Sequence, residues 1–282
     1  MNSEELKIED LVKALKVVTI PRAVPIYLMQ TILELIYKIE VTGLEYIPKE
    51  GGAIIICNHT DMLDIAVQGA YSPRKIIFLG KNEIFNPQEQ IIKYINQPGS
   101  PFLQFPLNMT KSYIEDTLNA MGEIYSNQLQ EWGSKPVVRN FHGNGAKAAV
   151  AYYEDLENFM ISLVKAGEII SIYPEGTRTE SGVMGAFKAM AAKLAIRAQV
   201  PIIPSGINGA WKMSEPKAFL SGAVFKTKIE YNVGNPITPD QFPKSAEKKA
   251  AKELTEELEK RVYFLATHRE RRGQSRRFMT VL

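Results

Sequence analysis

One histidine in the sequence stands where a general base would be useful, directly after an apolar run. The run Ala53–Cys57 (AIIIC) is followed by Asn58 and His59, and Asp64 comes five residues after the histidine. A carboxylate that accepts the Nδ1 proton of an imidazole leaves Nε2 free to take a proton from a hydroxyl. Five residues correspond to about 140° around a regular helix, so the two side chains meet only if His59 lies ahead of the helix. A capping or surface histidine can have the same spacing, so the pair alone does not distinguish a catalytic role from a structural one.

A second polar group, Pro174–Arg178 (PEGTR), follows another apolar run. Its proline and glycine predict a turn, which would present Glu175, Thr177 and Arg178 at the edge of a sheet. A guanidinium beside backbone N–H groups and a hydroxyl suits an anion, above all a phosphate. The alternative is a surface ion pair between Glu175 and Arg178 across the turn.

Together these motifs resemble a known family. Asn-His-x4-Asp after one strand, Pro-Glu-Gly-Thr-Arg after a second, then Gly185–Lys188 (GAFK) and Val200–Pro204 (VPIIP), resemble in that order the bacterial PlsC-like 1-acylglycerol-3-phosphate acyltransferases. The likeness covers roughly residues 40–235. It implies an α/β fold, acyl-CoA or acyl-carrier-protein as co-substrate with no other cofactor, and lysophosphatidic acid as the acceptor. It also implies attachment to the cytoplasmic face of the cell membrane, peripheral or monotopic.

The resemblance assigns roles to individual residues. His59 and Asp64 match the catalytic pair of the family. Four residues match its acceptor-phosphate motif: Glu175, Gly176, Thr177 and Arg178. Pro201 and its neighbours match the block linked to the acyl donor. The family's arginine after a short apolar strand is best matched by Arg139, and Lys188 is expected near the phosphate, although it also suits a solvent-facing helix start.

Other catalytic chemistries fit the sequence less well. Cys57 shares a strand face with His59, but a cysteine that ends a buried strand usually serves as a small hydrophobe. There is no Gly-x-Ser-x-Gly elbow, and the three histidines and single cysteine lack zinc-site spacing. We therefore expect no metal, and direct transfer in a ternary complex.

The elements that must position these residues alternate along the chain. The predicted strands are short β-branched runs: Ala53–Cys57, Lys75–Leu79, Glu168–Tyr173, Val200–Ile203 and Lys228–Asn232. A helix, Phe187–Gln199, is predicted between the third and the fourth. This alternation predicts an α/β fold, a mixed, largely parallel sheet covered by helices. The proline-rich segment 86–135 is predicted to be an insertion that forms a lid or an additional helical element, with a helix over Ile114–Leu129.

Three regions are predicted. Residues 1–40 form a helical membrane-association region, 41–243 the α/β acyltransferase domain, and 244–282 an amphipathic helix with a basic tail. Within the first region, Ile26–Tyr37 (IYLMQTILELIY) is strongly apolar. It suits a helix that lies in a membrane interface, although a buried core helix gives the same pattern. No run reaches ~20 uninterrupted apolar residues, so a spanning helix is not demanded.

The C-terminal region combines an apolar helix face with a concentration of positive charge. Four residues mark the apolar face: Leu254, Leu258, Val262 and Leu265. The chain carries a net charge of +3, but Lys260–Leu282 holds seven basic residues against one acidic, a net +6. Such an end suits an anionic lipid surface, or is a solvated terminus. Because no groove-reading motif accompanies it, nucleic acid is not an expected partner.

The sequence therefore predicts an enzyme that moves a fatty acyl group from an acyl thioester to the sn-2 hydroxyl of 1-acylglycerol 3-phosphate. His59 is the predicted general base, Asp64 fixes its tautomer, and Arg178 holds the phosphate. The alternatives are another lysophospholipid, glycerol 3-phosphate or an aminolipid as acceptor, or a non-catalytic lipid-binding protein on the same fold.

Overall fold

The computed structural model describes residues 20–137 and 145–266, and the chain divides into two compact units. The larger unit is formed by Ile26–Phe78 together with 142–282, and the smaller by 1–25 together with Leu79–Phe141. The predicted Arg139 and the basic residues after position 266 lie outside the described residues, as do residues 1–19 of the predicted N-terminal region. The predicted three-region division of the chain stays a prediction.

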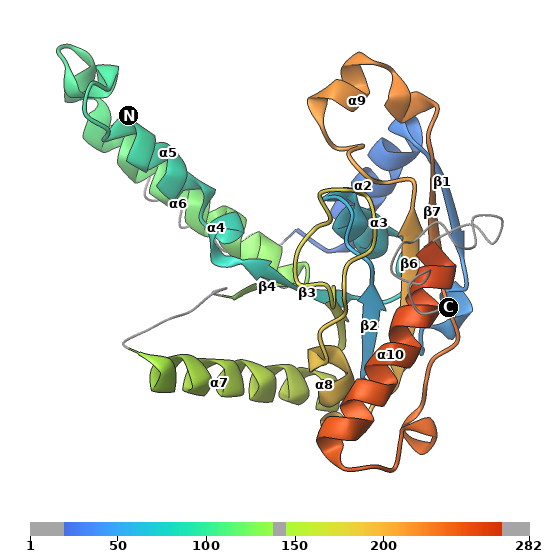
Figure 1. The fold of residues 1–282 in the computed structure, drawn as a ribbon. Coiled ribbons are helices and arrows are strands. Elements are labelled where there is room, and N and C mark those ends of the chain that lie inside the picture. Colours follow the sequence, from blue (N-terminus) through green and yellow to red (C-terminus); the bar gives the residue numbers. More distant parts are fainter. Residues whose placement is uncertain (1–19, 138–144, 267–282) are drawn as a thin grey trace, which may run out of the picture. The chain divides into compact units, whose positions relative to one another are not determined.

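A mixed sheet forms the centre of the larger unit (Figure 1). Its strands are β1 (Lys38–Thr42), β2 (Ala53–Cys57), β3 (Ile76–Lys81), β5 (Ile169–Ile172), β6 (Ile202–Asn208) and β7 (Lys228–Val233). They are ordered β1-β7-β6-β2-β5-β3, and β3 runs on into the smaller unit, where β4 (Ser134–Val137) is next in order. The pairs β1–β7, β2–β5, β2–β6 and β3–β5 are parallel, whereas β6–β7 is antiparallel. This confirms the predicted α/β fold with a mixed, largely parallel sheet.

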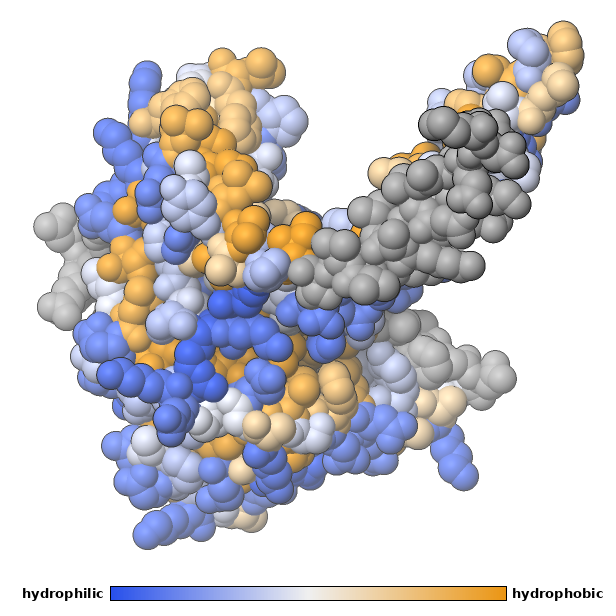
Figure 2. All heavy atoms as spheres, turned by 180° about the vertical axis from the view of Figure 1, so that it is seen from behind, coloured by the Kyte–Doolittle hydropathy of each residue, from blue (hydrophilic) through white to orange (hydrophobic). Residues whose placement is uncertain are grey.

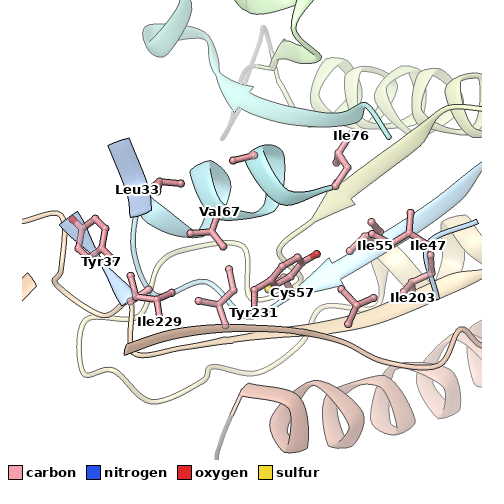
Figure 3. Packing of buried hydrophobic residues seen from close by; sticks show 14 of the residues in the cluster. Leu33, Tyr37, Ile47, Ile55, Cys57, Val67, Ile76, Ile203, Ile229 and Tyr231 are labelled. Atoms are coloured by element: carbon pink, nitrogen blue, oxygen red, sulfur yellow. The ribbon is translucent and has the colours of Figure 1, made fainter. Parts of the chain in front are cut away.

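Helices cover both faces of this sheet. They are α2 (Ala23–Ile36), α3 (Leu63–Tyr71), α7 (Ala146–Lys165), α8 (Met190–Ala198), α9 (Pro216–Leu220) and α10 (Glu247–Ala266), with short 3-10 turns at Leu44–Tyr46, Ala223–Phe225 and Pro239–Gln241. On one face, Leu33 of α2 and Val67 of α3 share a buried cluster with Ile55 and Cys57 of β2 (Figure 3). On the other face, α7, α8 and α10 pack on β5, β2 and β6. Every residue of β2 is buried, because this strand has neighbours on both sides and helices on both faces.

The predicted C-terminal amphipathic helix corresponds to α10. Its predicted apolar face is directed inward, since Leu254, Leu258 and Val262 are buried. The end of α10 lies directly on β6 at Gly206, where an added Cβ would be 2.3 Å from the backbone nitrogen of Ala266. Glycine is therefore the residue that allows this close approach.

The smaller unit contains a helical hairpin. Its elements are α4 (Asn82–Phe85), α5 (Pro87–Ile95), the 3-10 turns η2 (Pro101–Leu103) and η3 (Leu107–Met109), α6 (Lys111–Glu131) and β4. Helices α5 and α6 run antiparallel, because Gln88 near the start of α5 packs on Gly122, whereas Asn96 after its end donates to Glu115 at 2.5 Å. The predicted helix 114–129 lies within α6 and is confirmed. The role of this segment as a lid stays a prediction.

Helix α2 contains the predicted apolar segment at the N-terminal end of the chain. Leu33 is buried, while six large apolar side chains of α2 are exposed: Val24, Tyr27, Leu28, Met29, Ile32 and Leu35. The helix is thus apolar on the face that packs on the protein and on the outer face as well. Across the two described stretches, the structure contains no helix with the length and hydropathy needed to cross a membrane.

Candidate active site

The site begins where β2 ends. Asn58 joins this end to the neighbouring strand β6, since its Nδ2 donates to the carbonyl of Ile207 at 2.9 Å and its Oδ1 accepts from the N–H of Ile207 at 2.8 Å. A buried side-chain amide bonded in this way replaces the next rung of the strand ladder. The residue that follows, His59, therefore leaves the sheet from a fixed point.

The structure brings His59 and Asp64 together. The Nδ1 atom of His59 lies 2.9 Å from Oδ2 of Asp64, and the exposed fractions of the two residues are 7% and 0%. The contact is possible because α3 begins at Leu63, so that His59 lies ahead of the helix while Asp64 is in its first turn. Since an ionised carboxylate only accepts hydrogen bonds, Nδ1 carries the proton in a neutral imidazole and Nε2 keeps its lone pair.

The carboxylate of Asp64 is held by three further donors. Its Oδ2 accepts from the N–H of Thr60 at 2.5 Å and from the N–H of Asp61 at 2.8 Å, and its Oδ1 accepts from the hydroxyl of Thr60 at 3.0 Å. A buried carboxylate with its lone pairs occupied in this way has little freedom to rotate. These hydrogen bonds thus fix the position of the Asp64 carboxylate, and through it the orientation of the His59 imidazole.

The ring of His59 also stacks on an aromatic ring. Tyr173, the first residue after β5, lies with its ring centroid 4.1 Å from that of His59, and the two planes are 21° apart. Burial raises the pKa of the Tyr173 hydroxyl well above its ordinary value, with a smaller contribution from Cys57. The phenol therefore stays neutral, and its flat face positions the imidazole from one side.

Glu175 connects the two motifs. Its Oε1 accepts from the backbone N–H of His59 at 2.7 Å, and its Oε2 accepts from the backbone N–H of Gly185. Burial raises the pKa of this carboxyl, although the hydrogen bonds from Gly185 and His59 act in the opposite direction. With both oxygens bonded to backbone groups, Glu175 holds the segment 175–185 against the histidine. Its predicted role as a direct phosphate contact stays a prediction.

The turn after Glu175 presents a cation at the surface. Gly176 has φ 78°, and an added Cβ would lie 2.6 Å from Nζ of Lys188, so the lysine ammonium is next to this turn. Thr177 and Arg178 are exposed, and within residues 20–137 and 145–266 no ion pair involves Arg178. The backbone fixes the far side of the turn, because the N–H of Thr179 donates to the carbonyl of His59 at 2.9 Å. Arg178 in the turn and Lys188 beside it thus place two cations next to a segment that is hydrogen-bonded to His59.

Pro201 is not brought to this edge of the sheet. The parallel register pairs Ile202 with Ile54 and Ser205 with Cys57, so Pro201 lies beside the start of β2 whereas His59 follows its end. The carbonyl of Pro201 accepts from the N–H of Ile54 at 3.0 Å, which is a strand contact. Pro201 thus lies away from His59 along the strand, and its predicted role as a substrate contact stays a prediction.

Sequence reasoning missed two residues beside the site. Trp211 and Lys212 follow β6, whose last residues lie beyond the end of β2. The ring of Trp211 packs on Gly182, where an added Cβ would be 3.0 Å away, and Nζ of Lys212 lies 4.8 Å from the ring centroid of Trp211. Lys212 has φ 60°, a conformation that a residue with a side chain seldom adopts. The sequence did offer one indication of them: both residues follow the predicted strand Val200–Ile203, and ligand sites form at the ends of such strands.

The site offers neither a good thiol nucleophile nor a metal centre among the described residues. Cys57 is fully buried, and burial followed by the nearby charge of Asp64 raises the pKa of its thiol well above the ordinary value. A thiolate, the reactive form, is therefore disfavoured. In the part of the chain that the structure describes, no three His, Cys, Asp or Glu side chains are grouped to hold a metal ion.

Fold and site together define an α/β protein with a buried, oriented histidine–aspartate pair at the carboxyl edge of a sheet, beside a cationic turn. The model of the acyltransferase family matches residues 38–97 and 110–208. Because this is more than half of the chain and includes both motifs, the chain belongs to the acyltransferase family.

Relatives of the chain carry a more specific name. A Bacillus subtilis protein named 1-acyl-sn-glycerol-3-phosphate acyltransferase is 23% identical over 235 residues, which is 83% of this chain and 91% of the relative. A Caenorhabditis elegans protein provisionally given the same name is 27% identical over 165 residues, and the match spans 58% of this chain but 43% of that protein. The crystal structure of the 1-acyl-sn-glycerophosphate acyltransferase PlsC from Thermotoga maritima aligns over 93% of this chain and 83% of its own, with 16% identity and a TM-score of 0.48.

Proposed function

We propose that the protein transfers a fatty acyl group from acyl-CoA or acyl-carrier-protein to the sn-2 hydroxyl of 1-acylglycerol 3-phosphate. The observation that carries the proposal is the 2.9 Å contact between His59 Nδ1 and Asp64 Oδ2, beside a turn that Glu175 ties to the backbone of the same histidine. The names of the B. subtilis and C. elegans relatives support the choice of acceptor.

In the proposed mechanism, Nε2 of His59 takes the proton of the acceptor hydroxyl as its oxygen attacks the thioester carbonyl. The tetrahedral intermediate then collapses, the C–S bond breaks, and the imidazolium returns the proton to the departing thiolate. The products are an ester and a free thiol. Asp64 stabilises the imidazolium while it exists. A positioned base of this kind supplies about 10²–10⁴ in rate, and proximity and oxyanion stabilisation must supply the remainder.

Direct transfer from thioester to hydroxyl is favoured over a covalent acyl-enzyme. The one thiol of the chain, Cys57, is inside the sheet, and its raised pKa keeps it protonated. A base without an adjacent protein nucleophile suits a ternary complex in which the hydroxyl and the thioester are bound together. The histidine then acts on the substrate itself.

The phosphate of the acceptor is proposed to bind at the turn after Glu175. Arg178 is exposed there, Lys188 lies beside Gly176, and a guanidinium forms paired hydrogen bonds with phosphate oxygens. Because the turn is bonded to both the N–H and the carbonyl of His59, a phosphate held at Arg178 has a fixed relation to the base. Arg139 is proposed as a second contact on the strength of the sequence resemblance alone.

The protein is further proposed to work on the cytoplasmic face of the cell membrane as a peripheral or monotopic protein. The outer face of α2 is apolar, and exposed apolar side chains of α9 lie nearby, since the ring of Phe219 is 6.5 Å from that of Tyr37 (Figure 2). Such a face suits the boundary between headgroups and acyl chains. The single unpaired Cys57 suits a reducing compartment.

The test is a panel of acceptors with purified protein, read by mass spectrometry. We expect phosphatidic acid from lysophosphatidic acid and an acyl thioester. We also expect Arg178→Gln to raise the KM for this acceptor about tenfold or more with a smaller effect on kcat, since a charge-assisted phosphate contact is lost. Arg261→Gln on α10 is the matched control and should leave the KM unchanged. Turnover only with glycerol 3-phosphate, an aminolipid or a choline lysophospholipid would contradict the proposed acceptor, and no turnover at all would contradict the enzyme.

A further inference from the structure

The connection between α5 and α6, residues 96–110, forms the tip of the helical hairpin and carries no charge. Between Lys93 and Lys111 every residue is uncharged, although 23% of the whole chain is charged. The family model matches residues up to 97 and resumes at 110, so most of the tip, residues 98–109, lies outside the pattern that defines the family. The tip is a feature of this chain that the proposed active site does not explain.

The apolar side chains of the hairpin tip point outward. Phe105 is 80% exposed and Met109 is 76% exposed, and Leu103 and Leu107 are exposed as well. In Figure 2 this end of the hairpin shows apolar residues at the surface among polar ones. Single exposed apolar residues are ordinary on a protein surface, whereas four on one short uncharged connection mark a surface that meets an apolar partner.

Much of the backbone of the tip is hydrogen-bonded within the tip itself. Six N–H groups donate to carbonyls within the tip: Ser100 to Gln97, Leu103 to Ser100, Gln104 to Pro101, Asn108 to Gln104, Met109 to Pro106 and Thr110 to Leu107, all between 2.9 and 3.2 Å. The hydroxyl of Thr110 also donates to the carbonyl of Leu107 at 2.9 Å. Because an unbonded backbone group is costly in hydrocarbon, this internal bonding lowers the cost of moving these backbone groups into the interface.

The flanks of the tip select a lipid surface over a protein groove. Exposed Tyr94 and Tyr113 stand at the base of the tip, at the depth where amphipathic aromatic side chains prefer the headgroup region. Lys93 is exposed next to Tyr94, and Lys111 is partly exposed, 4.0 Å from Glu115. The apolar tip is thus bordered on each helix by a tyrosine and a lysine, two side chains that favour the headgroup region of an anionic bilayer.

We propose that the hairpin tip inserts into the interface of an anionic lipid bilayer and is a membrane contact separate from α2. The inference rests on the proposed function in one respect: an enzyme whose acceptor and product are lipids must reach them in the bilayer. The polar side chains Gln104 and Asn108 limit the insertion to the headgroup and upper acyl region.

The test uses a dye whose fluorescence depends on its surroundings, attached to a new cysteine. Cys57 is the single native cysteine and is fully buried, so Phe105→Cys can be labelled selectively in the folded chain. Met121→Cys, on α6 and 62% exposed, is the matched control on the stem of the hairpin. With vesicles of phosphatidylcholine and phosphatidylglycerol we expect a blue shift and quenching by brominated acyl chains at position 105, and neither effect at 121.

A loss-of-function variant adds an independent readout. Phe105→Glu/Met109→Glu should lower the partition coefficient onto the same vesicles about tenfold or more, while acyl transfer to a detergent-dispersed acceptor stays unchanged. Three results would overturn the proposal: no spectral change at 105 with vesicles, equal changes at 105 and 121, or a concentration-dependent shift without lipid, which indicates a second copy of the chain. The fluorescence requires no turnover, so an inactive wild-type protein would overturn the proposed function and leave this result standing.

Discussion

At the scale of single residues, His59 is constrained from three directions. Asp64 fixes Nδ1, the ring of Tyr173 supports one face of the imidazole, and Glu175 holds the backbone nitrogen. A base that is oriented before the substrate arrives has less to reorganise during the reaction. The arrangement supports Glu175 as a positioning residue for the histidine.

The buried carboxyl of Glu175 gives a pH-dependent prediction. Its pKa is raised from 4.5 in the folded protein, so between 4.5 and the raised value the unfolded chain has released a proton that the folded chain still binds. The contribution of Glu175 to the free energy of unfolding is therefore full below about pH 4.5 and falls as the pH rises through the raised pKa. Glu175→Gln stays neutral and lacks this dependence.

The measurement is urea unfolding of wild type and Glu175→Gln at a series of pH values. The free energy of unfolding of wild type minus that of the variant should be largest at the acidic end and should decrease as the pH rises. A difference that grows with pH would mean that the ionised carboxylate is the better-stabilised form in the folded protein.

The sequence predicts short-range contacts of the site better than long-range ones. The meeting of His59 and Asp64 follows from a five-residue spacing and a helix that starts between them. The bond from the backbone of His59 to Glu175 joins residues 116 apart and depends on which strands are neighbours. The position of Pro201 is long-range information of the same kind, because a motif does not indicate which end of its strand lies near His59.

At the scale of elements, the order of three parallel strands assembles the site. β2 lies between β5 and β6, so the segments that follow these strands reach the same carboxyl edge. His59 lies in the segment after β2, Glu175 in the segment after β5, and Trp211 in the segment after β6. Ligand sites of open α/β sheets form at this edge, and here the strand order alone accounts for the convergence.

The contact between β6 and α10 gives a stability prediction. Gly206→Ala would place a Cβ 2.3 Å from the backbone nitrogen of Ala266, so α10 must move away from the strand. We expect a loss of about 1–3 kcal/mol in the free energy of unfolding, the usual range for overpacking. The matched control is Gly69→Ala in α3, whose Cβ would meet only the ring of Phe78 at 3.5 Å.

Thermal and denaturant unfolding of the two variants checks this prediction. Gly69→Ala should be neutral or stabilising by up to about 1 kcal/mol, because alanine is the better helix residue. If Gly206→Ala matched wild type, α10 would not lie on β6 as closely as the structure has it.

Two of the elements that the sequence analysis did not predict, α7 and β1, were missed for physical reasons. Helix α7 exposes Val150, Tyr153 and Phe159 although it packs on β5, so its apolar residues do not form a single stripe. Strand β1 (KIEVT) is a short edge strand with no buried residue, and its pattern carries little signal. The central strands were found because burial on both faces makes them continuous apolar runs.

At the scale of the whole molecule, the segment 86–135 is part of the smaller of the two units and is not a plain loop. Its length and prolines indicated an additional element, but the antiparallel packing of α5 on α6 through Gln88 and Gly122 required the structure. Division of the chain into units depends on contacts between distant segments, which composition alone does not report.

Membrane attachment through the larger unit gives a prediction for the intact protein. Leu35 on α2 is 79% exposed, and Leu35→Glu places a charge on the face proposed to meet lipid. We expect the partition coefficient onto anionic vesicles to fall about tenfold, with unchanged transfer to a detergent-dispersed acceptor.

Vesicle sedimentation measures this effect, and Phe264→Glu is its control, since Phe264 is an exposed apolar residue on α10. The control should bind vesicles as the wild type does. Equal losses for both variants would show that added negative charge, and not the α2 face, is responsible.

The most direct test of the mechanism is the initial rate of acyl transfer by His59→Ala, with purified lysophosphatidic acid and an acyl thioester. The far-ultraviolet circular dichroism of the variant should match that of the wild type, so that a rate change is not a folding effect. We predict that kcat falls by about 10²–10⁴, the range for loss of a positioned general base. A folded His59→Ala protein that transfers the acyl group at the wild-type rate would contradict the account.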